Sequence, residues 1–204
     1  MIKNKKKDSI TKNSSLLSRW LYIKKFINSF TTMGSVTPSS KRACKILANQ
    51  IKSNGGYILE LGPGSGTVTK AILDSGVSYE KFIAVEIDEH FYHFMKNKFP
   101  KLNIIHASAT DLQKILPKDA IGNVSTIIST IPMLNLKEDL IKEIIDASFS
   151  VMKKDGNFVQ ICYKHTSPIN SKKFGLKQYK CATVLWNIPP MTVFEYQKEN
   201  KESY

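Results

Sequence analysis

A glycine-rich segment that directly follows an apolar stretch constrains this chain more than any other feature. Residues 58–66 read Ile-Leu-Glu-Leu-Gly-Pro-Gly-Ser-Gly, and a helix-like pattern begins at Thr67. Glycine forms tight turns that other residues resist, and it leaves space where a side chain would otherwise stand. A strand, a glycine turn and a helix in this order predict a nucleotide-type ligand site at the carboxyl end of a strand in an α/β fold.

Two carboxylates beside this turn distinguish between possible ligands. Glu60 stands two residues before the first glycine, where it suits the cationic amino group of a methionine moiety and would repel a pyrophosphate. Glu86 closes the second apolar run, where a carboxylate can accept both ribose hydroxyls of an adenosine. We therefore predict that Glu60, Gly62, Gly64, Gly66 and Glu86 bind S-adenosylmethionine. The alternative is a simple turn flanked by two solvated acids.

The pattern around this segment alternates between strands and helices, which predicts a Rossmann-like α/β fold with a mostly parallel seven-stranded sheet and helices on both faces. The predicted strands are Tyr57–Leu61, Phe82–Glu86, Asn103–His106, Val124–Ser129, Asn157–Tyr163, Gln178–Trp186 and Met191–Tyr196. The predicted helices are Thr67–Leu73, Glu89–Phe99 and Lys137–Met152, with at most a short helix within Ala109–Asn123. No helix separates the last two strands, so we expect a C-terminal antiparallel hairpin. Such a hairpin is typical of methyltransferase sheets.

The ends of the third and fourth strands supply further candidates. In this fold, the residue after the third strand often contacts the adenine amino group, so Ser108 or Asp111 could do so, with a surface turn as the alternative for either. The fourth strand ends in Ser129-Thr-Ile-Pro-Met133. Ligands sit outside the carboxyl ends of strands in open sheets, so Ser129 is expected beside the transferred methyl group.

Positive charge is concentrated before the predicted sheet. Residues 1–52 carry twelve basic side chains and one acidic one, whereas residues 53–204 carry 18 basic and 16 acidic side chains. Such a basic arm predicts a polyanionic partner, either nucleic acid or an anionic membrane. The predicted organisation is a disordered basic tail (1–15), N-terminal helices (16–56), the methyltransferase domain (57–197) and a polar tail (198–204).

The basic arm contains an amphipathic pattern from Leu16 to Phe30. Its apolar residues recur at helical spacing, and a second helix is expected from Pro38, capped by Thr37, to about Gly55. Taken alone, this pattern favours a first helix that packs on the domain, whereas the family resemblance given below favours one that binds an anionic membrane. Its predicted membrane-binding residues are Arg19, Trp20, Lys24, Lys25 and Phe26. There is no apolar run of 18 residues or secretory signal, and the cysteines are scattered, so we expect a cytoplasmic setting.

From about Leu16 to Tyr196 the sequence resembles the bacterial soluble-type phospholipid N-methyltransferases. The segments that carry the resemblance are Arg19-Trp20, Met33-Gly-Ser-Val-Thr-Pro-Ser-Ser40, Glu60-Leu-Gly-Pro-Gly-Ser-Gly66, Val85-Glu86, Ile128-Ser-Thr-Ile-Pro132, Gln160-Ile-Cys-Tyr163 and Asn187-Ile-Pro-Pro190. It implies methylation of phosphatidylethanolamine towards phosphatidylcholine with S-adenosylmethionine, at the cytoplasmic face of the inner membrane and with no nucleic acid. One departure is Ala107-Ser108-Ala109, where that family usually has Gly-Asp-Ala.

An RNA substrate is the alternative. The ribosomal RNA adenine dimethyltransferases of the same superfamily carry Asn-Ile/Leu-Pro-aromatic after the fourth strand, whereas this chain has Thr130-Ile-Pro-Met133. Neither the amide that would grip the adenine amine nor the ring that would stack on the base is present. Tyr163 is the candidate catalytic residue for contact with the lipid headgroup, with a core tyrosine as the equally weighted alternative. His165 is expected on the surface, and no metal is expected.

Overall fold

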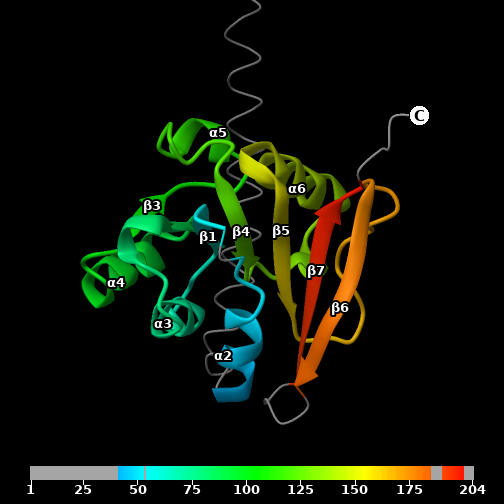
Figure 1. The fold of residues 1–204 in the computed structure, drawn as a ribbon, viewed down its shortest axis with the longest axis horizontal. Helices are drawn as coiled ribbons and strands as arrows, with labels where there is room; N and C mark the ends of the chain where they lie inside the picture. The colour runs from blue at the N-terminus through cyan, green and yellow to red at the C-terminus, as the bar shows by residue number, and fades with distance from the viewer. Residues whose placement is uncertain (1–40, 53, 185–189, 200–204) are drawn as a thin grey trace, which may run out of the picture. The chain divides into compact units, whose positions relative to one another are not determined.

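A computed structural model describes residues 41–52, 54–184 and 190–199. Every described element belongs to one compact unit, residues 37–204. That unit is built on a seven-stranded sheet with the order β3-β2-β1-β4-β5-β7-β6 (Figure 1). Its strands are β1 (Tyr57–Leu61), β2 (Phe82–Glu86), β3 (Asn103–His106), β4 (Val124–Ser129), β5 (Met152–Cys162), β6 (Leu176–Val184) and β7 (Met191–Lys198).

The first five strands are parallel, and β1 lies between β2 and β4. Leu61, at the end of β1, is in register with Val85 of β2 and with Ser129 at the end of β4. β2 also pairs in parallel with β3, and β4 pairs in parallel with β5. All five strands therefore end at the same edge of the sheet. This arrangement confirms the predicted α/β class and brings the glycine turn to the edge where open sheets bind ligands.

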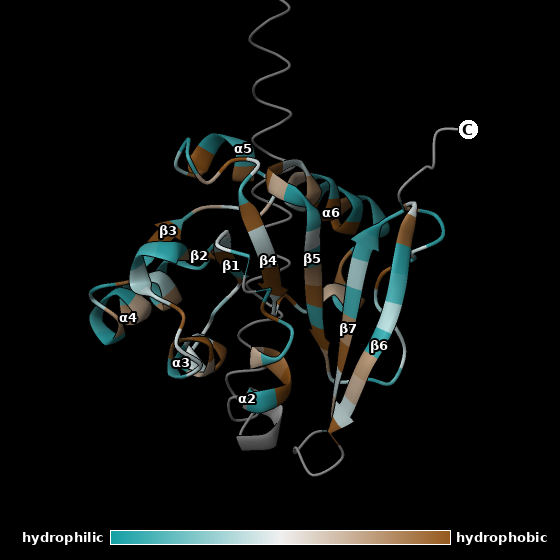
Figure 2. Ribbon diagram, in the orientation of Figure 1, coloured by the Kyte–Doolittle hydropathy of each residue, from teal (hydrophilic) through white to brown (hydrophobic). Residues whose placement is uncertain are grey.

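Helices cover both faces of the sheet, because alternate strand residues point to opposite sides. The helices are α2 (Lys41–Ala48), α3 (Thr67–Asp74), α4 (Glu89–Lys98), α5 (Leu112–Ile115) and α6 (Glu138–Val151), with short 3-10 turns η1 (Tyr79–Lys81) and η2 (Met133–Asn135). Ile58 belongs to the core cluster that contains residues of α2, α3 and α4. Leu59 and Leu61 belong to the cluster that contains residues of α5 and α6. In Figure 2 the central strand β4 is mainly hydrophobic, whereas β5 and β6 carry hydrophilic stretches.

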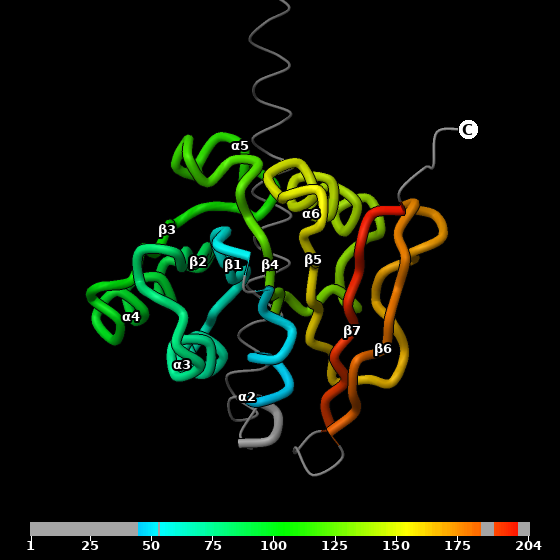
Figure 3. Tube along the Cα trace, viewed as in Figure 1, coloured from blue at the N-terminus to red at the C-terminus, as the bar shows by residue number. Residues whose placement is uncertain are grey.

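The C-terminal hairpin is antiparallel, as predicted. β7 pairs with β5 and β6 pairs with β7, so β6 is the edge strand (Figure 3). The predicted end of the first hairpin strand at Trp186 and the turn at 187–189 lie outside the described residues. The predicted amphipathic helix and the expected start of α2 at Pro38 also lie outside them.

Two element boundaries differ from the prediction by more than two residues. α2 ends at Ala48 instead of continuing to about Gly55. The chain that follows it is held by the strands instead, because the backbone N–H of Lys52 donates to Thr126 and the Asn157 amide donates to the Gln50 carbonyl. β5 begins at Met152, where we expected the end of a helix, and its pairing with β4 is interrupted by a register shift.

No helix in the described part of the chain is both long enough and apolar enough to span a bilayer.

Candidate functional site

The glycine turn connects β1 to α3 through residues with positive φ. Gly62, Gly64 and Gly66 have φ angles of 71°, 53° and 75°, in the left-handed region that favours glycine. The turn is attached to β2, because the Gly62 amide donates to the Val85 carbonyl at 2.9 Å. The sequence therefore predicted both the position of this turn and its need for glycine.

The glycines have different surroundings. A Cβ atom at Gly64 would meet nothing within 4 Å, so this position faces open space. A Cβ atom at Gly66 would lie 2.5 Å from the Phe99 ring and 2.6 Å from the Met95 sulfur. Gly66 thus allows α4 to pack closely against the turn, while Gly64 leaves the space in front of it clear.

Glu60 is fully buried on the face of β1 that α3 covers. Its Oε2 accepts a hydrogen bond of 2.6 Å from the Thr69 hydroxyl, and its Oε1 has no partner. Burial, with a smaller contribution from the nearby Glu86 carboxylate, raises the pKa of Glu60 to about 8, although the Thr69 hydrogen bond opposes the shift. An unpartnered carboxylate oxygen in the core is costly unless the group is protonated or paired with a donor.

Glu86 holds the glycine turn against β2. Its two oxygens accept from the backbone amides of Gly64 at 3.0 Å and of Asp88 at 2.9 Å. Burial raises the pKa of Glu86, and these backbone hydrogen bonds oppose the increase. The Ile87 amide supplies a further backbone hydrogen bond, and a carboxylate has about four acceptor positions, so the side chain can still accept a hydroxyl. Asp88, which the sequence analysis did not single out, caps α4 by accepting from the amides of His90 and Phe91.

The loop after β3 lies next to Glu86. The Ala107 amide donates to the Glu86 carbonyl at 3.0 Å, which places Ser108 one residue from this contact. The Ser108 hydroxyl lies 2.8 Å from that of Thr110, whereas the Asp111 carboxylate forms an ion pair of 2.6 Å with Lys114. The two candidates for contact with adenine therefore differ: Ser108 contacts another hydroxyl, whereas Asp111 is engaged in a local ion pair.

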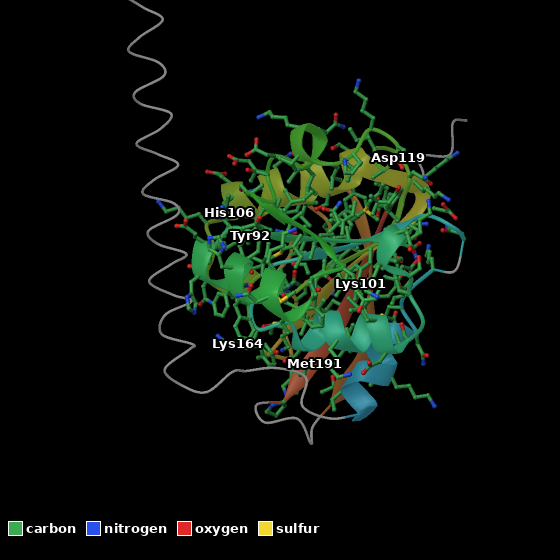
Figure 4. The ribbon with its side chains drawn as sticks, turned by 90° about the vertical axis from the view of Figure 1, so that its left-hand side faces the viewer. Tyr92, Lys101, His106, Asp119, Lys164 and Met191 are labelled. Carbon is green, nitrogen blue, oxygen red and sulfur yellow. The ribbon has the colours of Figure 1, made fainter. Side chains whose placement is uncertain are left out.

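An aromatic pair supports the same loop. The Tyr92 and His106 rings are stacked with centroids 5.1 Å apart, and His106 Nε2 lies 3.1 Å from the Ile87 carbonyl. Figure 4 labels both residues, next to each other. These contacts join α4 to the end of β3. The sequence indicated neither side chain, because the two are distant in sequence and meet only through the fold.

The end of β4 is tied to the glycine turn. Ser129 is fully buried and its hydroxyl has no partner. The next residue, Thr130, donates its hydroxyl to the carbonyl oxygens of Leu61 and Gly62. In the adjacent strand, the buried Gln160 amide donates to Ile131 at 2.9 Å and to Ile161 at 2.7 Å, and its Oε1 is unpaired. Sequence reasoning placed Thr130 and Gln160 in motifs but missed this positioning role.

Tyr163 follows the end of β5 and is half-buried. It packs against the core cluster on the α2–α3–α4 side of the sheet, the face on which Glu60 also lies. Burial raises the pKa of its hydroxyl, so the group is neutral at physiological pH. His165 is exposed, as expected. Within the described ranges no group of three or more His, Cys, Asp or Glu side chains is placed to bind a metal ion.

Comparison with known proteins decides the family. Residues 36–181 match the ribosomal RNA adenine dimethylase family. The chain belongs to this family. Its members are class I methyltransferases, so the protein is an S-adenosylmethionine-dependent methyltransferase.

The curated relatives of this protein differ in the molecule that their names say they methylate. An ornithine lipid N-methyltransferase of Singulisphaera acidiphila is 25% identical over 70% of this chain and 76% of the relative. A ribosomal RNA small subunit methyltransferase A of Mycoplasmoides gallisepticum is 26% identical over 60% of this chain and 48% of the relative. The chain thus spans about half the length of that RNA enzyme and three quarters of the lipid enzyme.

Solved structures agree with the fold. A TehB-like methyltransferase from Corynebacterium glutamicum has a TM-score of 0.58 at 12% identity and covers 88% of this chain and 99% of its own. The glycopeptide N-methyltransferase MtfA, solved with S-adenosylmethionine, has a TM-score of 0.59 at 10% identity and covers 76% and 92%. The expected class I fold is therefore confirmed.

The residues present fit S-adenosylmethionine. The open space at Gly64 allows a ligand to lie against the backbone. Four residues earlier in the chain, Glu60 Oε1 is a buried hydrogen-bond acceptor without a partner. Glu86 retains acceptor capacity at the end of the neighbouring strand.

The raised pKa of Glu60 predicts a pH-dependent stability. Between about 4.5, its ordinary value, and about 8, the folded protein keeps a proton that the unfolded chain has lost. The free energy of unfolding should therefore fall as pH rises through this window, by up to about 1.4 kcal/mol per pH unit. Glu60→Gln cannot titrate, so its stability relative to the unsubstituted protein should increase with pH. Urea unfolding without cofactor at pH 5, 6.5 and 8 measures this, and parallel profiles would contradict it.

Proposed function

We propose that this protein methylates the amine of phosphatidylethanolamine, towards phosphatidylcholine, at a membrane surface. S-adenosylmethionine supplies an electrophilic methyl group carried on a sulfonium. The acceptor ammonium must lose a proton before its nitrogen can be methylated, and much of the rate of such a transfer comes from holding the two reactants together. The protein's task is therefore to position the amine and to exclude water.

We assign cofactor binding to the glycine turn and its two carboxylates. In this assignment Glu60 receives the methionine amino group, Glu86 receives the ribose hydroxyls, and Gly64 provides the space between them. Ser108 is the better placed adenine partner, because Asp111 is paired with Lys114. Ser129, with its unpaired hydroxyl, lies at the edge where the methyl group is transferred.

The segment after β4 is the observation that most favours an acceptor other than adenine. The Thr130 hydroxyl, which stands where the RNA enzymes have their asparagine amide, is directed at the carbonyl oxygens of Leu61 and Gly62. Met133, which stands in place of their aromatic residue, is 1% exposed and packs in the core. This segment therefore lacks both the group that would grip the adenine amine and a ring that would stack on the base.

Tyr163 is the proposed headgroup contact. It follows β5 at the carboxyl edge, and its neutral hydroxyl can orient an amine while its ring can face the cationic product. The curated relative that acts on ornithine lipid supports a lipid amine as acceptor.

RNA remains the second candidate, and the expectation of no nucleic-acid partner is not supported. The chain belongs to the ribosomal RNA adenine dimethylase family and matches curated RNA methyltransferases. The twelve basic side chains in residues 1–52 would serve RNA phosphates as well as anionic lipid. The assays below therefore measure both acceptors.

Membrane association is proposed from the sequence alone, because residues 16–30 lie outside the described part. An apolar stripe with Trp20 and Phe26, rimmed by Arg19, Lys24 and Lys25, suits the bilayer interface. Each basic residue near an anionic surface adds roughly 1 kcal/mol.

Replacing Gly64 should damage cofactor binding more than folding. Gly64→Ala places a methyl group in the open space and costs about 1–2 kcal/mol of backbone strain at φ 53°. Gly122→Ala is the matched control, because its φ is 73° and its added Cβ also meets nothing within 4 Å. Calorimetric titration with S-adenosylmethionine should show at least a tenfold loss of affinity for Gly64→Ala alone. Equal affinities in the two variants would refute the assignment.

The acceptor should be a lipid amine. In a bacterium that makes no phosphatidylcholine, expression of the full chain should yield mono-, di- or trimethylated phosphatidylethanolamine, detected by lipid mass spectrometry. Tyr163→Phe should reduce the product at least tenfold while keeping cofactor affinity, whereas Tyr179→Phe, at an exposed position of β6, should not. An unchanged lipid profile together with new dimethyladenosine in the RNA would instead support the RNA function.

Membrane recruitment should need both charge and apolar contact. The full chain should sediment with vesicles that contain phosphatidylglycerol, and added salt should release part of it. The double variant Trp20→Ser with Phe26→Ser should remain in the supernatant. If it sediments like the unsubstituted protein, the N-terminal segment does not bind the membrane.

A further inference from the structure

A pocket on the α6 side of the sheet is lined by residues that follow β4 and β5 in the chain. Its volume is about 240 Å³. Most of its lining is apolar and includes Met133, Leu134, Leu136, Ile141 and Phe174. Its walls come from η2, the start of α6 and the segment that follows β5. The proposed cofactor assignment uses none of these residues.

The position of the pocket suits an acceptor. Its first wall begins four residues after Ser129, and its second wall is formed by the chain between β5 and β6. Both strands run parallel and end at the edge where open sheets bind ligands. Met133 and Ile141 belong to the core cluster on the α5–α6 side, whereas Glu60 faces α3. The pocket is therefore distinct from the glycine turn, and its first wall follows the end of β4 within four residues.

The chain around the second wall is strongly basic. From Gly156 to Phe194 the sequence contains no aspartate or glutamate, and its basic residues are Lys164, Lys172, Lys173, Lys177 and Lys180. All five lysines are exposed. Lys173 forms an ion pair of 2.8 Å with Glu138 of the opposite wall. An exposed ion pair of this kind contributes little to stability, so it links the two walls only weakly.

An apolar pocket with Lys173 at its rim, on a lysine-rich segment, matches an amphipathic anion. We propose that this pocket takes the first methylenes of an acyl chain of a phospholipid acceptor, with the lysines of residues 164–180 near its phosphate. The inference rests on the lipid function proposed above. A water occupies roughly 30 Å³ in the liquid, so the pocket has space for about eight waters and suits a short hydrocarbon segment. RNA phosphates would suit the lysines, but RNA would not occupy the apolar part of the pocket.

The test compares acceptors with and without chains. The purified full chain is assayed with dihexanoylphosphatidylethanolamine, as monomers, and with glycerophosphoethanolamine, which has no acyl chain. Leu134→Trp should narrow the pocket. Burial of one CH₂ corresponds to about a fourfold change in affinity, so losing two or more should lower the ratio of kcat/KM for the two acceptors at least tenfold. Asn170→Trp, at an exposed position of the other wall, is a second narrowing variant.

Phe94→Trp is the matched control, because Phe94 is 44% exposed on α4, away from the pocket. It should leave the ratio unchanged. A ratio that stays constant in both pocket variants, while the unsubstituted protein methylates the lipid, would overturn the pocket assignment alone. Failure of the unsubstituted protein to methylate either ethanolamine acceptor, with methylation of RNA, would overturn the proposed function and this inference with it.

Discussion

The parallel pairing of β1 with β2 and β4 is the constraint on which the site depends. It aligns Leu61 with Val85 and with Ser129, so that three chain segments end together. The backbone of the glycine turn can then donate to β2 and accept from the residue after β4. Without this register, the turn would have no fixed distance from Glu86 or from the acceptor side.

Some buried polar groups stabilise this edge of the sheet, and others there keep an oxygen without a hydrogen-bond partner. Glu86 and Thr130 satisfy backbone groups of the turn. Glu60, Ser129 and Gln160 each keep one buried oxygen without a partner. Such groups reduce stability in a protein interior, and they commonly mark the places where function requires a ligand. Their concentration at the ends of β1, β4 and β5 agrees with a transfer reaction at that edge.

Family membership and acceptor identity are separate matters in this protein. The sequence match places it among the ribosomal RNA adenine dimethylases, and its fold is that of class I methyltransferases. The segment at Thr130–Met133 departs from the signature of the RNA enzymes, and a lipid-methylating relative shares three quarters of its length with this chain. A common cofactor site combined with a changed segment after β4 is how one fold can serve different acceptors.

The sequence by itself determined the strands Tyr57–Leu61, Phe82–Glu86 and Val124–Ser129, because short, mainly apolar runs identify strands buried on both faces. It also located Asn103–His106, a strand that is only partly buried. It also determined the glycine turn, since only glycine favours the positive φ angles found there. Only the tertiary structure decided that Thr69 bonds Glu60, that Thr130 holds the turn, and that an apolar pocket forms after β4 and β5. Thr130 and Leu61 are 69 residues apart, and contacts of that range leave no periodic pattern in a single sequence.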